Sequence, residues 1–212
     1  MQICEAEINA LRLAVRKYMS EKRYKHTLGV EAMAKKLAEY CLKDKISLIR
    51  CAALLHDIAK EMPLDEQISV LREMPEITDS DLSSPPAYHA FCVPYLIKRD
   101  FPELAKADIL SAVFNHTTGN PEMSTFDEII FLADFIEEGR EYEDCKTIRE
   151  KLLKRLETAK SNNECLLWLH AAVIAELDST LRSLQKRGMY INERTIATKD
   201  AFYKKMPMPL EL

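Results

Sequence analysis

The chain has 212 residues, of which 47% are hydrophobic and 30% are charged, a globular composition with enough apolar side chains for the core of one domain. Its formal net charge is −4 and its Lys and Arg residues are scattered, so it lacks the basic face that duplex nucleic acid requires. The cysteines show no CxxC spacing, and the sequence offers neither a secretory signal nor an apolar run of membrane-spanning length. We therefore expect a cytoplasmic protein with reduced thiols and no membrane or nucleic-acid partner.

Helical spacing of apolar residues dominates the chain, which contains only four glycines. Scarce glycine disfavours a β-rich fold and any glycine-rich phosphate loop, so the sequence predicts one all-α domain over 1–212. A first helix is marked by Leu11, Ala14, Val15 and Tyr18. The later predicted helices cover approximately residues 22–43, 47–60, 64–73, 87–99, 103–115, a stretch after Ser124, 163–186 and a short segment near Lys199.

Loop and capping residues set the expected boundaries between these helices. Residues 74–88 contain three prolines and many turn formers, and 117–123 reads TTGNPEM, so both segments are predicted loops. Ser124 with Asp127 resembles a capping box, and Ser161 with Glu164 marks the start of the long helix that Gly188 ends. A loose tail containing Pro207 and Pro209 is expected to close the chain.

Four of the five histidines form an ordered series that ends with an aspartate. The series consists of His26, His56 with Asp57, His89, His116 and Asp134. Imidazole is the commonest metal ligand in proteins, and carboxylates beside it suit divalent cations. Asp57 lies in an otherwise apolar helix, where burial of a carboxylate is unfavourable unless it is paired or metal-bound. His56 and Asp57, a doublet at the end of this helix, can both reach one ion, and Asp57 can bridge two ions.

These residues predict a metal site in the core of the helical bundle. The predicted ligands of the first ion are His26, His56, Asp57 and Asp134. His89 and His116 are either ligands of a second ion or donors to substrate oxygens. Two other side chains are read as structural. His170 is expected to be a hydrogen-bonded core residue, and Trp168 is expected to pack in the core rather than stack on a base.

The order H…HD…D resembles the HD superfamily of metal-dependent phosphohydrolases. Longer strings are similar to its YqeK branch, the symmetrical bis(5′-nucleosyl)-tetraphosphatases: RYKHTLGVEAMAKKLA, ALLHDIAKEMP, AYHAFCVPYL and FNHTTGNPEMSTFDEIIFLADFIEEGREY. The resemblance covers residues 18–185, which would be the phosphohydrolase body, and leaves 190–212 as a C-terminal tail without a match. Glu138 departs from the family, which usually has proline before the glycine and arginine, so the position of Arg140 is left open.

This resemblance implies a hydrolase that cleaves diadenosine tetraphosphate symmetrically to two ADP, with metal-activated water attacking phosphorus. It implies iron, one or two ions, on the four predicted ligands, although manganese, zinc or cobalt would fit the same nitrogen and oxygen donors. Asp57 and Lys60 are the expected catalytic residues. The expected substrate-binding residues are Arg23, Lys60, His89, His116, Thr117, Thr118, Gly119 and Arg140.

Alternatives remain at this point for single residues and for the whole chain. Lys60 can be a solvated lysine at a helix end, and Thr117 to Gly119 can be a simple turn. Other nucleotides, such as dNTPs or guanosine alarmones, would need almost the same metal site. A mixed-valent di-iron oxygenase would need two ions, and a non-catalytic helical module would not need the ligands. The oligomeric state is also left open, and a homodimer is one alternative because the helix 163–186 is apolar on more than one face.

Overall fold

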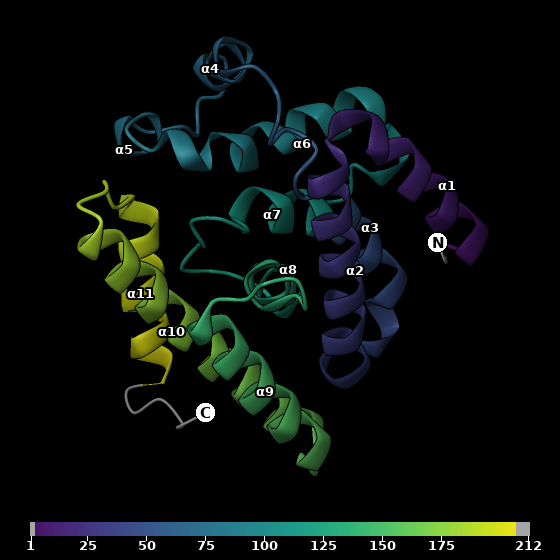
Figure 1. Cartoon of the computed structure of the whole chain (residues 1–212), viewed down its shortest axis with the longest axis vertical. Coiled ribbons are helices and arrows are strands. Elements are labelled where there is room, and N and C mark those ends of the chain that lie inside the picture. The colour runs from purple at the N-terminus through teal and green to yellow at the C-terminus, as the bar shows by residue number, and fades with distance from the viewer. Residues whose placement is uncertain (1–2, 207–212) are drawn as a thin grey trace.

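The computed structural model describes residues 3–206, and eleven α-helices make up most of this range (Figure 1). In chain order these helices are α1 (Glu5–Val15), α2 (Glu21–Cys41), α3 (Ile46–Leu55), α4 (Leu64–Arg72), α5 (Asp79–Leu82), α6 (Tyr88–Asp100), α7 (Ala107–Asn115), α8 (Thr125–Ile136), α9 (Glu143–Thr158), α10 (Asn162–Lys186) and α11 (Glu193–Lys205). Short 3-10 helices cover Arg16–Tyr18, Lys43–Lys45, Pro85–Ala87 and Pro102–Leu104. The described range contains no strand, so the predicted all-α class is confirmed.

Helix α8 lies at the centre of the bundle. It packs against α2 and α3 on one side, against α10 on the other and against α7, and Figure 1 shows it end-on between these helices. Its residues from Phe126 to Ala133 are all buried, because a helix that is covered on every side carries apolar residues around its whole circumference. This position brings Asp134, near the C-terminal end of α8, into the middle of the molecule.

The helix starts follow the capping signals. Ser124 accepts from the backbone N–H of Asp127, and the Asp127 carboxylate accepts from the Ser124 N–H at 2.8 Å, so the predicted capping box is confirmed. Ser161 accepts from the N–H of Glu164 at 3.2 Å and begins α10 as predicted. Ser20 caps α2, six residues before His26.

Helix α3 is shorter than predicted. It ends at Leu55 instead of continuing to residue 60, and residues 56–61 form successive turns. Hydrogen bonds between residues three apart replace those of an α-helix, which join residues four apart. The N–H of Ile58 donates to the Leu55 carbonyl at 3.2 Å, and the N–H of Lys60 donates to the Asp57 carbonyl at 2.9 Å. The doublet His56-Asp57 therefore stands just beyond a helix end, where its two side chains can turn toward one point.

Other segments also depart from the predicted boundaries. The segment 74–88, predicted as a loop, contains α5 and a 3-10 turn, and the helix predicted from 103 begins only at Ala107. Helix α9 was not predicted at all. The short helix expected near Lys199 extends over Glu193–Lys205. The tail with Pro207 and Pro209 lies outside the described residues.

Helix α11 is held on the body by a buried ion pair. The Arg194 guanidinium donates to both carboxylate oxygens of Asp81 at 2.9 to 3.1 Å, and Asp81 is fully buried. One turn further on, Thr198 lies against Gly119, where an added Cβ would stand 2.7 Å from the Thr198 methyl. Gly119 also has a φ of +72°, which favours glycine at this turn. Helix α11 thus supports the loop that follows His116.

Helix α10 packs against α2, α8, α9 and α11. These contacts within one chain account for its apolar character on several faces, so that character gives no support to a homodimer. His170 contacts Glu128 at 3.3 Å and stacks on Phe202, as expected of a core histidine. Trp168 packs partly buried against the core beneath Arg155. Within residues 3–206, no helix combines the length and apolar character needed to cross a membrane.

Candidate metal centre and cleft

Four of the predicted ligands converge from three parts of the chain. His26 lies on α2, His56 and Asp57 follow α3, and Asp134 lies on α8. His26 Nε2 is 3.0 Å from Asp134 Oδ1 and 3.8 Å from Asp57 Oδ2. His56 Nε2 is 3.4 Å from Asp57 Oδ2 and 4.0 Å from Asp134 Oδ1. The nitrogen and oxygen atoms of His26, His56 and Asp134 lie close enough together for one ion.

A second group of atoms meets the other oxygen of Asp57. His89, in the first turn of α6, places Nε2 3.3 Å from Asp57 Oδ1, and His116, at the end of α7, places Nε2 3.8 Å from the same atom. The Nε2 atoms of His89 and His116 are 3.2 Å apart. Asp57 is 2% exposed. It lies between two sets of imidazoles, with His26 and His56 near Oδ2 and His89 and His116 near Oδ1. This arrangement is suited to one ion or to two ions that share Asp57.

Hydrogen bonds at the far ring nitrogens orient the imidazoles. Nδ1 of His56 donates to the Ala53 carbonyl at 2.6 Å, and Nδ1 of His116 donates to the Val113 carbonyl at 2.7 Å. Because a carbonyl only accepts, both rings carry the proton on Nδ1 and turn Nε2 toward the cluster. The buried Nε2 atoms of His26 and His56 have no hydrogen-bond partner among the described residues. Unpaired imidazole nitrogens beside two carboxylates fit a bound divalent cation.

Three cationic side chains surround the cluster. Arg23 Nη1 is 2.7 Å from Asp57 Oδ2, and Arg140 Nη2 is 2.6 Å from Asp134 Oδ1. The Arg140 Nε donates to the backbone carbonyl of Asp134 at 3.0 Å. Lys60 Nζ lies 3.2 Å from His89 Nε2. Arg140 therefore reaches the cluster although Glu138 replaces the expected proline, and Lys60 is turned inward rather than solvated at a helix end.

The electric field of the cluster is strong because its charges are buried. Burial opposes ionisation of Asp57, but His56 and His116 hold its pKa well below the usual range. Burial also opposes ionisation of Asp134, and His26 and His56 hold its pKa low. Burial disfavours a charged His26, yet the neighbouring carboxylates of Asp134 and Glu137 raise its pKa to about 9. Burial lowers the pKa of Lys60. The two carboxylates thus stay ionised for a cation.

Comparison with known proteins agrees with this centre. The family model described as HD domain matches residues 23–157 of the chain, which include His26, His56, Asp57 and Asp134. The chain belongs to the HD domain family.

Two curated relatives align with most of the chain. A protein of Halalkalibacterium halodurans, named symmetrical bis(5′-nucleosyl)-tetraphosphatase, is 33% identical over 89% of this chain and 92% of its own. A Bacillus subtilis protein of the same name is 32% identical over 87% and 91%. A solved structure from Clostridium acetobutylicum, described as a predicted HD superfamily hydrolase involved in NAD metabolism, aligns with a TM-score of 0.78 and 28% identity over 93% of this chain and 97% of that one.

The HD domain centre lies in a cleft of ≈ 670 Å³. Six predicted substrate-binding residues line it, namely Arg23, Lys60, His89, His116, Thr117 and Arg140. The Thr117 hydroxyl is 3.3 Å from His89 Nε2. Thr118 and Gly119 do not line this cleft: Thr118 is buried and contacts the Gly119 carbonyl, and Gly119 lies against α11. The geometry thus gives no support to direct substrate contacts by these two residues.

The structure adds two carboxylates that the sequence pattern missed. Glu137 Oε1 is 3.2 Å from His26 Nδ1, so it orients this imidazole from behind. Arg149 on α9 donates to the carbonyl oxygens of Ile136 and Glu137 and thereby holds the end of α8. Glu176 on α10 lines the cleft, and burial raises its pKa well above the usual range. Glu137 lies in the string that resembles the family, three residues after Asp134, but its contact with His26 depends on how the end of α8 packs against α2. Glu176 comes near the cluster only through the packing of α10.

Proposed function

We propose that this chain is a metal-dependent hydrolase that cleaves diadenosine tetraphosphate symmetrically to two ADP. One observation carries the proposal: a shared carboxylate between two sets of imidazoles lies in a cleft whose inner wall carries Arg23, Lys60 and Arg140. Metal ligands and cations in one cleft suit a substrate with several phosphates. The names of the relatives at 33% and 32% identity supply the substrate class and the position of cleavage.

The proposed ligands of the first ion are His26, His56, Asp57 and Asp134. His89 and His116, with the second oxygen of Asp57, are proposed for a further ion. A divalent metal bound there lowers the pKa of water, supplies the nucleophile at neutral pH and offsets charge on phosphoryl oxygens. We propose iron, and the nitrogen and oxygen donors also suit manganese, zinc or cobalt.

The chain's own residues then orient the polyphosphate. Arg23 and Arg140 lie on either side of the cluster, 2.7 Å from Asp57 and 2.6 Å from Asp134, so each guanidinium can turn its remaining N–H groups to phosphate. The Lys60 ammonium and the Thr117 hydroxyl both approach His89, at 3.2 and 3.3 Å, and can donate to a phosphoryl oxygen there. In this proposal Asp57 fixes the nucleophile, and Lys60 stabilises charge that grows on the phosphoryl group.

The proposal is tested by incubating the purified protein, with its metal content measured, with diadenosine tetraphosphate and separating the products. ADP alone is expected. ATP with AMP would overturn symmetrical cleavage and retain a nucleotide hydrolase. No turnover of this substrate would refute the proposal, and the next assays would use dNTPs and guanosine alarmones. Oxygen consumption by a two-iron form would identify an oxygenase instead.

A further inference from the structure

The cleft continues beyond the metal cluster along one face of α10. This face carries Glu176, Ser179, Thr180, Ser183 and Arg187, all of which line the cleft. Glu176, Thr180, Ser183 and the C-cap residue Arg187 follow at intervals of three or four residues, which places them on one side of the helix, and Ser179 lies beside Thr180. The rise from Glu176 to Arg187 is about 16 Å. A row of hydrogen-bonding side chains therefore leads away from the cluster.

Glu176 is the innermost residue of this row. It is 5% exposed, and its Oε2 atom is buried without a hydrogen-bond partner among the described residues. Buried carboxyl oxygens are nearly always paired, so an unpaired one on a cleft wall indicates a partner that arrives with a ligand. Thr180 and Ser183, one and two turns further along α10, offer hydroxyl groups on the same wall.

Two aromatic side chains also line the cleft. Phe135 follows Asp134 on α8, and Tyr142 immediately precedes α9. Tyr142 is 75% exposed, and its side chain makes no capping hydrogen bond to α9. An exposed ring at the edge of a polar cleft is available to stack on a planar base.

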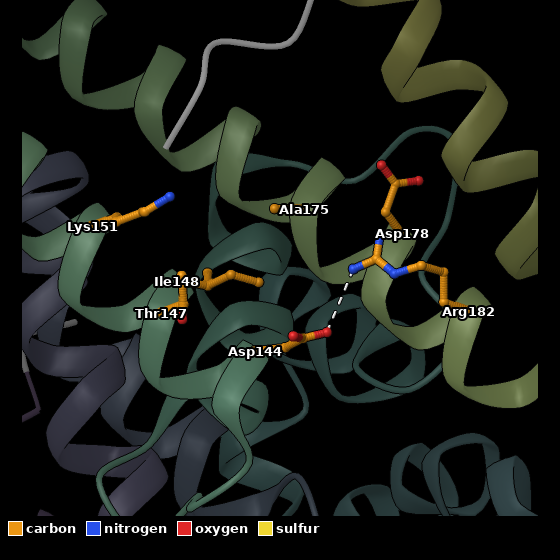
Figure 2. A pocket seen from close by; sticks show the side chains of 7 residues that line it. All are labelled: Asp144, Thr147, Ile148, Lys151, Ala175, Asp178 and Arg182. Carbon is orange, nitrogen blue, oxygen red and sulfur yellow. Dashed lines mark hydrogen bonds and ion pairs between the residues drawn. The ribbon is translucent and has the colours of Figure 1, made fainter. Parts of the chain in front are cut away.

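In the neighbouring pocket between α9 and α10, the charges of Asp144, Asp178 and Arg182 are already paired. Figure 2 shows Arg182 reaching Asp144 across this pocket, at 3.5 Å. Asp178 accepts from Lys199 at 2.7 Å and from the Tyr203 hydroxyl. Asp144 also accepts from the Ser179 hydroxyl and so lies at the boundary with the cleft. On the cleft side of α10, by contrast, the buried Oε2 of Glu176 has no partner among the described residues.

Charge divides the cleft into two parts. The cations Arg23, Lys60 and Arg140 surround the cluster, whereas Glu176 and the hydroxyls of α10 follow outward, with Arg187 at the far end of the row. Phosphate favours the cationic part, and the hydroxyl groups of a sugar favour carboxyl and hydroxyl partners. We propose that the outer part is a nucleoside subsite, in which Glu176 and Thr180 hydrogen-bond the ribose and the Tyr142 ring stacks on the base. This subsite rests on the proposed function for the nature of its ligand, a nucleoside phosphate.

The test measures Kd on the metal-loaded protein by calorimetry with ADP, 2′,3′-dideoxy-ADP and inorganic tripolyphosphate. Wild-type protein is expected to bind ADP about 10-fold more tightly than the dideoxy analogue. Glu176→Met keeps the side-chain shape and is expected to abolish this preference, whereas Glu176→Gln, which still hydrogen-bonds, keeps most of it. Tyr142→Ala is expected to weaken both nucleotides about 10-fold and to leave tripolyphosphate unchanged. Tyr95→Ala, an exposed tyrosine outside the cleft, is the control.

Equal affinity of the wild-type protein for ADP and its dideoxy analogue would overturn the ribose contact. A preference that survives Glu176→Met would do the same, and unchanged binding by Tyr142→Ala would overturn the stacking. These measurements need no turnover. Ribose-dependent binding without hydrolysis of diadenosine tetraphosphate would support the subsite and refute the proposed function. Hydrolysis of diadenosine tetraphosphate together with equal affinity for ADP and its dideoxy analogue would support the proposed function and refute the subsite.

Discussion

The ion pair between Arg194 and Asp81 makes a quantitative prediction for the substitution Arg194→Ala. Removing one partner of a buried pair typically lowers the free energy of unfolding by about 3–5 kcal/mol. Here Asp81 would keep three other donors, because Asn192 Nδ2 and the N–H and hydroxyl of Thr78 lie 2.9 to 3.0 Å from its carboxylate. We therefore expect a loss nearer about 2 kcal/mol.

Urea denaturation followed by circular dichroism measures this loss. With an m-value of about 2 kcal/mol/M, the midpoint should fall by about 1 M. Arg182→Ala is the matched control, because Arg182 also pairs with an aspartate, at 3.5 Å, but is well exposed. It should change stability by less than about 1 kcal/mol. If Arg194→Ala behaved like this control, the reasoning that burial strengthens the pair would be refuted.

The same pair predicts a pH dependence. Burial opposes ionisation of Asp81, but its bond to Arg194 lowers its pKa below the ordinary 3.8. A carboxyl whose folded pKa lies below its unfolded pKa stabilises the fold above the unfolded value, and this contribution disappears as the pH falls through the folded value. The stability difference between wild type and Arg194→Ala should therefore be constant near pH 7 and shrink below about pH 4. A difference that grew in acid would contradict this assignment.

Three further substitutions test the metal centre. Asp57→Ala should lower both metal content and turnover by at least about 100-fold while the helical circular dichroism persists, because both sets of imidazoles lose their shared oxygens; normal metal content would contradict the ligand assignment. Lys60→Ala should slow turnover by about 10- to 100-fold with metal retained, as element analysis would show; metal loss would mean that Lys60 supports the ligands. Glu137→Ala should weaken metal binding in a chelator competition by about 10-fold, whereas Glu138→Ala, the exposed neighbour, should not.

The local signals in the sequence were sufficient for much of the fold. Apolar spacing and capping residues predicted α2, α8 and α10 closely, because Ser124 and Ser161 make the hydrogen bonds expected of them. Helix α9 was missed although Cys145, Ile148 and Leu152 repeat at helical spacing on its buried face. Its many charged residues hid this narrow stripe, and a search for periodicity rather than for apolar content would have found it.

The candidate site was predictable only where residue type carried the chemistry. Histidine and aspartate in a fixed order indicated the cluster, and the structure brings all six of these side chains together. The order alone did not place Glu137 or Glu176. Glu137 lies three residues after Asp134 in the string that resembles the family, but its partner His26 is 111 positions away, and nothing in the sequence around Glu176 distinguishes it from a solvated carboxylate. Their placement depends on how α8 and α10 pack, which local spacing does not encode.

The proposed metal ligands come from five separate helices or helix ends, and this origin has a practical consequence for preparing the protein. Residues on α2, after α3, on α6, after α7 and on α8 must all be in place before the cluster exists. A fragment or a misassembled bundle would present only isolated histidines, which bind metal weakly. If the proposed ligands bind metal, metal stoichiometry should report correct assembly. Supplying the metal during refolding should then raise the yield, because binding to the native state draws the folding equilibrium toward it.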